Sequence, residues 1–323
     1  MATATSNDSL ATLLKLCSSF VLGFSTGHVG TTTISSASSY GNSSSVAHFF
    51  FEECTLSELL PLMRNENALP AQEHHVRTVW ARHLVSKLSR RGARTAGVCV
   101  DLSHYTLPFY RGLISVLQAS GRPLSLVRIR RDACEVASSF FSSGSRFGAC
   151  VAAVGFCPLH AAMVGSLVLS TGTTRAAWSN WTAFQKALWI ADETEAQWLR
   201  RVVPGALGVI GAQTSILEVS WSSAGSAVDP PIRAALDPIA RSLGLSAALP
   251  ENIANKKQHV KGTLPVPVEF QRAQLLEYSK QLHRDYPESR SLQLPSHAAL
   301  WRLHRLLPGE LTPGADLVAR SGG

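Results

Sequence analysis

Two patterns of hydrophobic and polar residues alternate along the chain. Continuous apolar runs of strand length lie at residues 17–25, 95–102, 124–131 and 215–221, and they predict buried β-strands. Apolar residues at intervals of three and four predict helices between and after these runs. The expected helices cover about 71–91, 107–120, 132–141, 176–203, 268–286 and 296–307. Strands that alternate with helices predict an α/β fold with a mostly parallel sheet that is covered on both faces.

Local signals indicate where several of these elements begin and end. Gly92 and Gly121 each follow a predicted helix, where glycine favours termination. Asp132 stands at the start of the next helix and is placed to cap it. These residues make the strand–helix alternation between residues 71 and 141 the best-defined part of the sequence.

The chain shows no division into separate domains. It contains no internal repeat and no linker long enough to force a boundary. We therefore predict a single domain over residues 1–323. Its core is expected over about 17–245, and a helical carboxyl-terminal extension is expected over about 246–323.

The composition is that of a globular protein with a positive net charge. Hydrophobic residues make up 45% and charged residues 16% of the 323 positions. The formal net charge of +8 favours an anionic partner, and a nucleotide-sized ligand satisfies that charge as well as a polymer does. No run of arginine and lysine carries interleaved aromatic residues, so we expect no nucleic-acid partner.

Cysteine and histidine patterns give no sign of a metal site. None of the cysteines forms a CxxC pair, and the histidines show no HExxH motif. We predict buried free thiols in a reducing compartment and no bound metal. The six cysteines are Cys17, Cys54, Cys99, Cys134, Cys150 and Cys157.

One segment has the length of a membrane span. Residues 147–170 carry no charged side chain and could cross a bilayer by length alone. Pro158 and His160 interrupt the segment, and Gly, Ala and Ser dilute it, so we predict a buried connection and no membrane span. The amino terminus lacks the basic start of a signal peptide. We expect a cytoplasmic protein, or a protein of the Golgi lumen if an anchor is missing from this chain.

The strongest sign of chemistry is the loop that follows the first predicted strand. The sequence STGHVGTTT puts backbone amides and hydroxyl groups at the start of a helix expected from about Thr31, which is a suitable anion site. Aligned with the phosphate-loop pattern GxxxxGK[ST], the loop carries Thr31 where the lysine should stand. The predicted anion-binding residues are Ser25, Thr26, Gly27, His28, Val29, Gly30, Thr31, Thr32 and Thr33.

This loop resembles the 5′-phosphosulfate loop of sulfotransferases, whose common form is P-K-S-G-T-T. Gly30, Thr31 and Thr32 match, and the family's lysine falls on His28. In the family that lysine steadies the bridging oxygen of the leaving nucleotide. The resemblance implies that His28 does this work here, as a charged or hydrogen-bonding imidazole.

A second segment resembles the family's 3′-phosphate motif, R-D-P-x-x-V-x-x-S. The sequence RDACEVASS brings Arg131 and Ser139 into register, and an alanine replaces the proline. An arginine at a strand end and a hydroxyl from the next helix can converge on one phosphate. Arg130 and Ser138 have the same spacing, so this alternative register remains open.

The segment between these two motifs supplies a candidate base. Residues 98–109, VCVDLSHYTLPF, resemble the sulfotransferase strand that leads to a catalytic histidine near Leu-Pro, which implies His104 as the base. Asp101, Glu52 and Glu53 remain alternatives, because some carbohydrate sulfotransferases use a carboxylate.

The resemblance implies a three-layer fold like that of P-loop NTPases, with a helical carboxyl-terminal extension. It also implies 3′-phosphoadenosine 5′-phosphosulfate as the donor, with a small-molecule or carbohydrate acceptor that offers a hydroxyl or an amine. The scheme needs no metal. Lys256, Lys257 and Lys261 form either a basic lid over the nucleotide or a plain solvated loop.

A helix further along resembles a group of uncharacterised sulfotransferase-like proteins that share the pattern W-x-x-D-E-x-E-A-x-W. We interpret its acidic residues as a solvated face or as partners of Arg200 and Arg201. The matching residues are Trp189, Asp192, Glu193, Glu195, Ala196 and Trp198.

Two other function classes remain open. A P-loop nucleotide kinase or hydrolase predicts magnesium-dependent binding of ATP, and the absent lysine counts against it. A non-catalytic anion-binding scaffold on the same fold is compatible with His28 in the loop.

Overall fold

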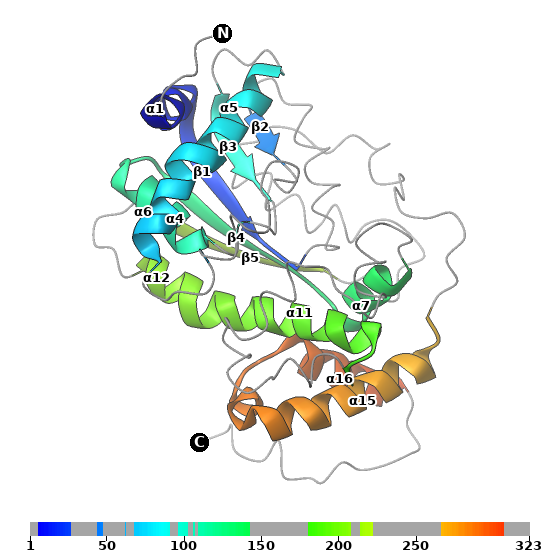
Figure 1. Cartoon of the computed structure of the whole chain (residues 1–323). Helices are drawn as coiled ribbons and strands as arrows, with labels where there is room; N and C mark the ends of the chain where they lie inside the picture. The colour runs from blue at the N-terminus through cyan, green and yellow to red at the C-terminus, as the bar shows by residue number, and fades with distance from the viewer. Residues whose placement is uncertain are drawn as a thin grey trace.

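A parallel sheet forms the centre of the protein (Figure 1). The computed structural model of the chain describes residues 6–26, 44–47, 62, 68–90, 96–102, 106, 109–142, 180–207, 214–221 and 266–306. Within them, five strands pair in the order β2-β3-β1-β4-β5, and every pairing is parallel. The strands are β1 (Cys17–Phe24), β2 (Ser44–Ala47), β3 (Ala96–Asp101), β4 (Leu124–Arg131) and β5 (Thr214–Trp221). The predicted α/β class and the four predicted strands are confirmed.

The described helices include all those predicted from residue 71 onward. They are α4 (Leu69–His75), α5 (Ala81–Arg90), α6 (Tyr110–Ala119), α7 (Ala133–Ser142), α11 (Ala183–Gln197), α12 (Val203–Leu207), α15 (Val268–Asp285) and α16 (Pro295–Leu306). Two π-helical turns, η1 (Val76–Trp80) and η4 (Trp198–Val202), make α4–α5 and α11–α12 continuous, and the 3-10 turn η5 (Pro287–Ser291) lies between α15 and α16.

Helix α1 (Ser6–Leu16) was not predicted. It runs directly into β1, whose apolar run begins at Cys17. Leu10 and Leu13 are buried in the core, whereas the residues between them are exposed. The spacing of those two leucines is the helical signal that the longer apolar run concealed.

One face of the sheet is covered by three helical segments. Phe20 of β1 packs against Trp80 of η1, and Phe24 packs against both Tyr110 of α6 and Trp198 of η4. The crossovers from β2 to β3, from β3 to β4 and from β4 to β5 therefore all use this face. All three run in the same direction across the sheet, as crossovers of one handedness must.

Helix α11 lies between this face of the sheet and the carboxyl-terminal helices (Figure 1). It packs against α7, α15 and α16, and its residues from Phe184 to Gln197 are buried. Helices α15 and α16 thus form a further layer outside α11. As a result α11 has no solvated face, although its sequence includes three acidic residues.

Two predicted local signals are confirmed. Gly121 follows α6 with φ of 69°, in the left-handed region that glycine adopts without strain. Asp132 caps α7, because its Oδ1 accepts hydrogen bonds from the backbone N–H groups of Cys134 and Glu135, at 3.0 and 3.1 Å. Gly92 lies outside the described residues.

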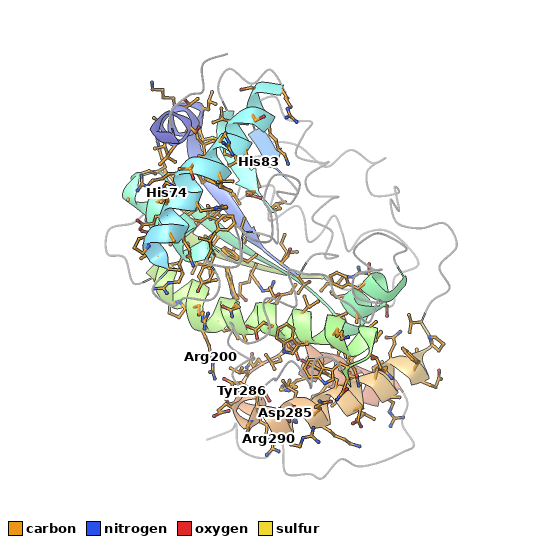
Figure 2. All side chains as sticks on the ribbon, viewed as in Figure 1. His74, His83, Arg200, Asp285, Tyr286 and Arg290 are labelled. Carbon is orange, nitrogen blue, oxygen red and sulfur yellow. A yellow bond between two sulfur atoms is a disulfide. The ribbon has the colours of Figure 1, made fainter. Side chains whose placement is uncertain are left out.

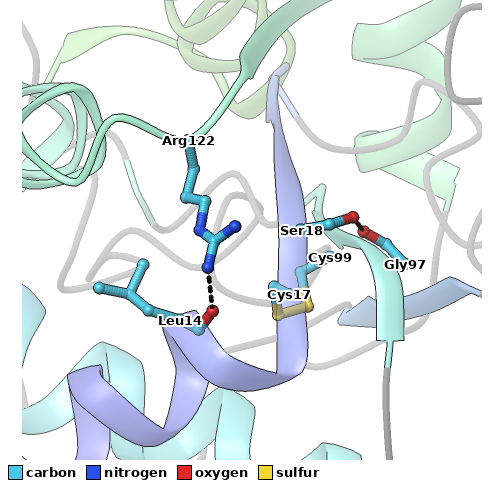
Figure 3. The surroundings of a disulfide bond; sticks show 6 residues. All are labelled: Leu14, Cys17, Ser18, Gly97, Cys99 and Arg122. Atoms are coloured by element: carbon cyan, nitrogen blue, oxygen red, sulfur yellow. Dashed lines mark hydrogen bonds between the residues drawn. A yellow bond between two sulfur atoms is a disulfide. The ribbon is translucent and has the colours of Figure 1, made fainter.

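The prediction of free thiols is wrong for two cysteines. Cys17 at the start of β1 and Cys99 in β3 form a disulfide between adjacent strands (Figure 3). Their positions in separate sequence segments hid the pairing, because only strand adjacency brings them together. Cys134 is free and buried, as predicted, and burial raises the pKa of its thiol. The other three cysteines lie outside the described residues.

None of the helices in the described part of the chain combines the length and the hydropathy that crossing a bilayer requires. The uncharged segment 147–170 lies outside those residues, as does the lysine segment 256–261.

Candidate functional site

The candidate site lies at the edge of the sheet where β1 and β4 end. These strands are neighbours, and Phe24, the last residue of β1, pairs with Arg128 of β4. Ser25 and Thr26, the first two predicted anion-binding residues, follow Phe24 and are buried. Arg131 is the last residue of β4. The two segments that were expected to hold one ligand therefore start from adjacent strand ends.

The strand order gives this edge a further property. From β1 the chain continues to β2, at one end of the strand order, whereas from β4 it continues to β5, at the other end. In open α/β sheets, ligands bind at the carboxyl ends of strands whose connections diverge in this way.

Several predicted site residues lie outside the described part of the chain. They are Gly27, His28, Val29, Gly30, Thr31, Thr32, Thr33 and His104, with the alternative bases Glu52 and Glu53. The described portion of the site thus consists of the ends of β1, β3 and β4 and the start of α7.

Arg131 and Ser139 lie on β4 and on the helix that follows it. Arg131 is partly buried, and its Nε donates to Glu135 at 2.8 Å within the first turn of α7. Ser139 is also partly buried, in the second turn of the same helix. A carboxylate therefore already lies beside the predicted phosphate ligand Arg131.

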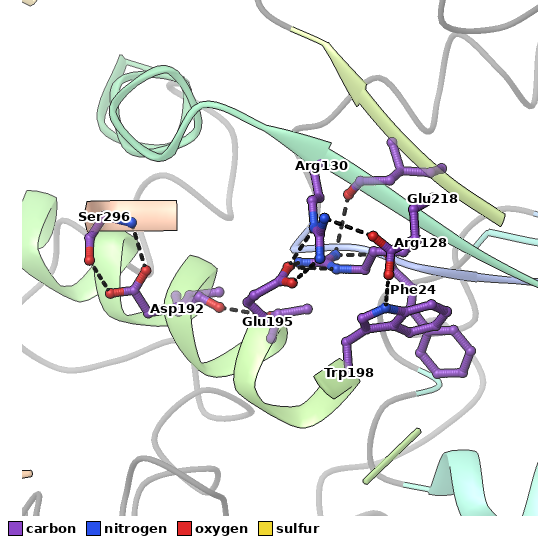
Figure 4. A network of polar contacts seen from close by, with 11 residues as sticks. Phe24, Arg128, Arg130, Asp192, Glu195, Trp198, Glu218 and Ser296 are labelled. Atoms are coloured by element: carbon purple, nitrogen blue, oxygen red, sulfur yellow. Dashed lines mark hydrogen bonds and ion pairs between the residues drawn. The ribbon is translucent and has the colours of Figure 1, made fainter. Parts of the chain in front are cut away.

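Arg130 lies in a different charge environment. Its guanidinium forms two hydrogen bonds to Glu195 of α11, and its Nη1 lies 2.8 Å from Glu218 of β5. Figure 4 shows this group from close by. With carboxylates on two sides, the charge of Arg130 is compensated within the protein.

Arg128 is the more deeply buried of the two arginines, with 1% of its surface exposed. Its Nε and Nη2 donate to Glu195 at 3.1 and 2.8 Å. Its Nη1 donates to the carbonyl of Phe24 at 2.9 Å and to that of Ile129 at 3.2 Å. Burial lowers the pKa of Arg128, and Glu195 opposes that shift. One guanidinium thus joins helix α11 to the last residue of β1.

The neighbouring aromatic residue extends this network. Trp198 packs against Phe24 with the two rings tilted, and its indole N–H donates to Glu218 at 2.8 Å. Two arginines and two glutamates are therefore gathered over the ends of β1, β4 and β5. The sequence segment LVRIRR gave a signal for this cluster, because alternation places Arg128 and Arg130 on one face of a strand.

A second buried acid lies one turn earlier on α11. Asp192 accepts hydrogen bonds from the hydroxyl of Tyr278 at 2.9 Å, from the backbone N–H of Ser296 at 2.9 Å and from the Ser296 hydroxyl at 2.5 Å. All three donors are neutral. Burial raises the pKa of Asp192 to about 7, against the effect of these hydrogen bonds. The contact to Ser296 is visible in Figure 4.

The interpretation of the α11 acids as a solvated face is wrong. Asp192, Glu193 and Glu195 are each 1% exposed or less. Helices α15 and α16 cover Asp192, whereas Glu195 faces the arginines of β4. Glu193 accepts from Gln197, and Arg200 donates to the hydroxyl of Tyr286 at 2.9 Å. Figure 2 shows Arg200 and Tyr286 facing each other from η4 and the end of α15. Sequence spacing could not reveal that a distant helical pair covers Asp192 or that Glu195 faces the sheet.

Helix α16 also reaches the start of α7, beside the candidate site. Arg302 donates to both carboxylate oxygens of Asp132, at 3.1 and 2.8 Å. Burial raises the pKa of Asp132, and Arg302 opposes that shift. The residue next to Arg131 is therefore fixed by the carboxyl-terminal helices.

Asp101, an alternative base, has a structural partner. It is buried at the end of β3, and its Oδ2 accepts from the indole N–H of Trp80 at 2.7 Å. This bond fastens η1 to the sheet. Among the described residues, no cluster of three or more His, Cys, Asp and Glu side chains could hold a metal ion.

Comparison with known proteins identifies no relative. No protein-family model matches the sequence, and no curated protein and no solved structure matches it.

Proposed function

We propose that this protein is a sulfotransferase that uses 3′-phosphoadenosine 5′-phosphosulfate, built on a three-layer fold like that of P-loop NTPases. The loop after β1 holds the 5′-phosphosulfate group, and Arg131 and Ser139 hold the 3′-phosphate. A small molecule or a carbohydrate supplies the accepting hydroxyl or amine.

The observation that carries this proposal is the pairing of β1 with β4. Two sequence motifs that lie about a hundred residues apart begin at adjacent, parallel strand ends. One adenosine nucleotide with phosphates at both ends can bridge such a pair of sites, and a diverging strand pair is where α/β sheets bind ligands. A chance match of two motifs does not require this adjacency.

The charge environments favour Arg131 over Arg130 as the phosphate ligand. Arg130 pairs with Glu195 and Glu218, which belong to two other elements, whereas Arg131 pairs with Glu135 on the helix that follows it. A phosphate at the strand end competes more easily with a carboxylate in the adjoining helical turn than with two carboxylates from separate elements.

Strand alternation favours the same choice. Arg128 and Arg130 point toward Glu195 and α11, so Arg131 points to the opposite face of β4. The connection from β1 to β2 runs across the sheet in the opposite direction to the other crossovers.

The proposed reaction is a single displacement at sulfur. The acceptor oxygen or nitrogen attacks the sulfur, and the bond from sulfur to the bridging oxygen of the 5′-phosphate breaks. The proton of the acceptor passes to His104, and adenosine 3′,5′-bisphosphate leaves with the electron pair. His28 and the loop amides stabilise the charge that develops on the bridging oxygen.

The disulfide is relevant to the cellular compartment in which the protein resides. Disulfide bonds persist in oxidising compartments and are rare in the cytosol. The Cys17–Cys99 bond therefore favours the lumenal alternative over the cytoplasmic one. A lumenal sulfotransferase meets carbohydrate acceptors, which agrees with the acceptor class proposed.

Isothermal titration with adenosine 3′,5′-bisphosphate and with ATP and magnesium tests the proposal. We expect the bisphosphate to bind without magnesium, and Arg131→Ala and Ser139→Ala each to weaken binding at least tenfold. Glu135→Ala is the matched control, because it frees Arg131 from its carboxylate and should leave binding unchanged or tighter.

Other results would count against a sulfotransferase. A preference for ATP with magnesium would favour the kinase or hydrolase class. Absence of binding to either nucleotide would leave an anion-binding scaffold as the better description. An equal loss in Arg131→Ala and Glu135→Ala would indicate that the pair is structural.

A further inference from the structure

We infer that Arg128 is a positioning residue, which fixes the point where the chain leaves β1 for the proposed phosphosulfate loop. Arg128 belongs to neither sequence motif, and it lies on the face of the sheet opposite Arg131. It acts through the backbone of Phe24 rather than through contact with a ligand. This inference rests on the proposed function for its role in binding, whereas the positioning itself can be tested without a ligand.

The central contact is the hydrogen bond from Arg128 to the Phe24 carbonyl. Phe24 is the last residue of β1, and its carbonyl accepts from Arg128 Nη1 at 2.9 Å. Ser25 and Thr26, which follow, are buried and begin the proposed loop. The direction of the Phe24 carbonyl sets the orientation of the next peptide unit. A fixed hydrogen bond at this carbonyl therefore fixes the exit of the chain from the strand.

The guanidinium itself is rigidly held. Its Nε and Nη2 donate to the same oxygen of Glu195, and Nη1 is shared between the carbonyls of Phe24 and Ile129. Glu195 is anchored in turn by Arg130 and lies on a fully buried helix. The planar fork of arginine can hold a carboxylate on one side and a carbonyl on the other, which the point donor of lysine cannot do with the same geometry.

The cost of this arrangement supports a specific role. Burying an ion pair is expensive, and apolar residues of similar volume often stabilise a fold equally well. Before position 128 this face of β4 is apolar, with Leu124 and Leu126 buried. An arginine at position 128 is therefore unnecessary for filling the core, and its particular contribution is the bond to Phe24.

Arg130 provides a matched control on the same strand face. It binds the same glutamate and carries the same charge, but no hydrogen bond from it to the Phe24 carbonyl is found among the described contacts. Replacing Arg128 by methionine leaves Glu195 paired with Arg130. Replacing Arg130 by methionine leaves Glu195 paired with Arg128 and the Phe24 bond intact.

Hydrogen exchange on the full-length protein tests the positioning directly. Peptides that include Phe24, Ser25 and Thr26 should exchange at least tenfold faster in Arg128→Met than in the wild type. Arg128→Lys should give an intermediate rate, since lysine restores the charge and one donor. Arg130→Met should exchange like the wild type there, and peptides of β3 and β5 should be unchanged in all three variants.

Titration with adenosine 3′,5′-bisphosphate then links position to binding. We expect Arg128→Met to bind at least tenfold more weakly and Arg130→Met to bind like the wild type. If Arg128→Met fails to fold, both hydrogen exchange and titration are measured on Arg128→Lys. We expect faster exchange and weaker binding than in the wild type, by a smaller factor than for Arg128→Met.

Two results would overturn the inference. One is unchanged exchange at Phe24–Thr26 in the folded Arg128 variants. The other is an equal effect in Arg130→Met, or faster exchange spread over the whole sheet, which would indicate a merely structural ion pair. If the wild type does not bind the bisphosphate, the proposed function fails, and the exchange comparison still decides whether Arg128 positions the end of β1.

Discussion

Two acidic residues on one helix, Glu195 and Asp192, show how differently a protein can bury a carboxylate. Both lie on α11, one turn apart, and both are inaccessible to solvent. Glu195 faces the sheet and receives hydrogen bonds from two guanidinium groups. Asp192 faces α15 and α16 and receives hydrogen bonds only from neutral donors.

The difference lies in charge compensation. Hydrogen bonds from hydroxyl and amide groups stabilise a carboxylate, but they do not cancel the desolvation of its charge. The pKa of Asp192 is accordingly raised to about 7 by burial. The Asp192 centre, which fastens the carboxyl-terminal helices, therefore responds to protons, and the Glu195 centre joins α11 to the candidate site.

The largest effect is expected from breaking the ionic centre with Glu195→Gln. The side chain keeps its size, but Arg128 loses the carboxylate that compensates its buried charge. Removing one partner of a buried pair typically costs about 3–5 kcal/mol. Urea denaturation measures the loss, and the double variant Arg128→Met/Glu195→Gln should recover part of it. A loss below about 1 kcal/mol would mean that Arg128 has other compensation.

A smaller, pH-dependent effect is expected from Asp192→Asn. The Asp192 carboxyl binds its proton more tightly in the folded than in the unfolded state, so its contribution to stability falls as pH rises from about 4 to about 7. Asparagine can accept from the Ser296 amide and donate to the two hydroxyls. Relative to the wild type, the variant should therefore gain on the order of 2–4 kcal/mol between pH 4 and pH 8.

Thermal or urea unfolding at several pH values checks this prediction. Asp132 provides the comparison, because it is also a buried acid with a raised pKa but has Arg302 as an ionic partner. Asp132→Asn should lose stability at pH 8 by breaking that pair. Parallel stability curves for the wild type and Asp192→Asn across this range would show that Asp192 is not titrating there.

The two centres also mark what the sequence could and could not predict. Strand and helix positions followed from local periodicity, and the cap at Asp132 and the turn at Gly121 followed from residue type. The burial of Asp192 depends on helices that lie about ninety residues further along the chain, and that of Glu195 on the pairing of α11 with β4. No local pattern on α11 carries that information, so the acids looked like a solvated face.

In the candidate site, too, some residues could be predicted from the sequence and others could not. The segment at Arg131 was found by its spacing, and it lies at the end of the strand that pairs with β1. Arg128 was missed because it matches no motif and its role depends on a backbone carbonyl in another strand. The Cys17–Cys99 bond was missed for the same reason, since it too depends on strand pairing.

A moderate effect at the Asp192 centre is expected from Tyr278→Phe. The variant removes one neutral donor and leaves the ring packed against Trp181. Loss of a hydrogen bond to a charged group should cost about 1.5 kcal/mol at pH 8, and less at pH 5, where the carboxyl is protonated. The pKa of Asp192 should rise further. A loss that does not vary with pH would show that the hydroxyl serves packing alone.

The smallest effect is expected from Arg130→Met. This variant tests whether Arg130 belongs to the buried ionic centre at Glu195. Arg130 and Glu218 have side chains that are 30% and 39% exposed, so water and salt screen their interaction. We expect a loss of about 0.5–1 kcal/mol at low salt and a smaller loss at 1 M sodium chloride. Arg128 should keep Glu195 compensated in this variant. A loss above about 2 kcal/mol that salt does not change would place Arg130 inside the buried centre, and the contrast between the two arginines would then be lost.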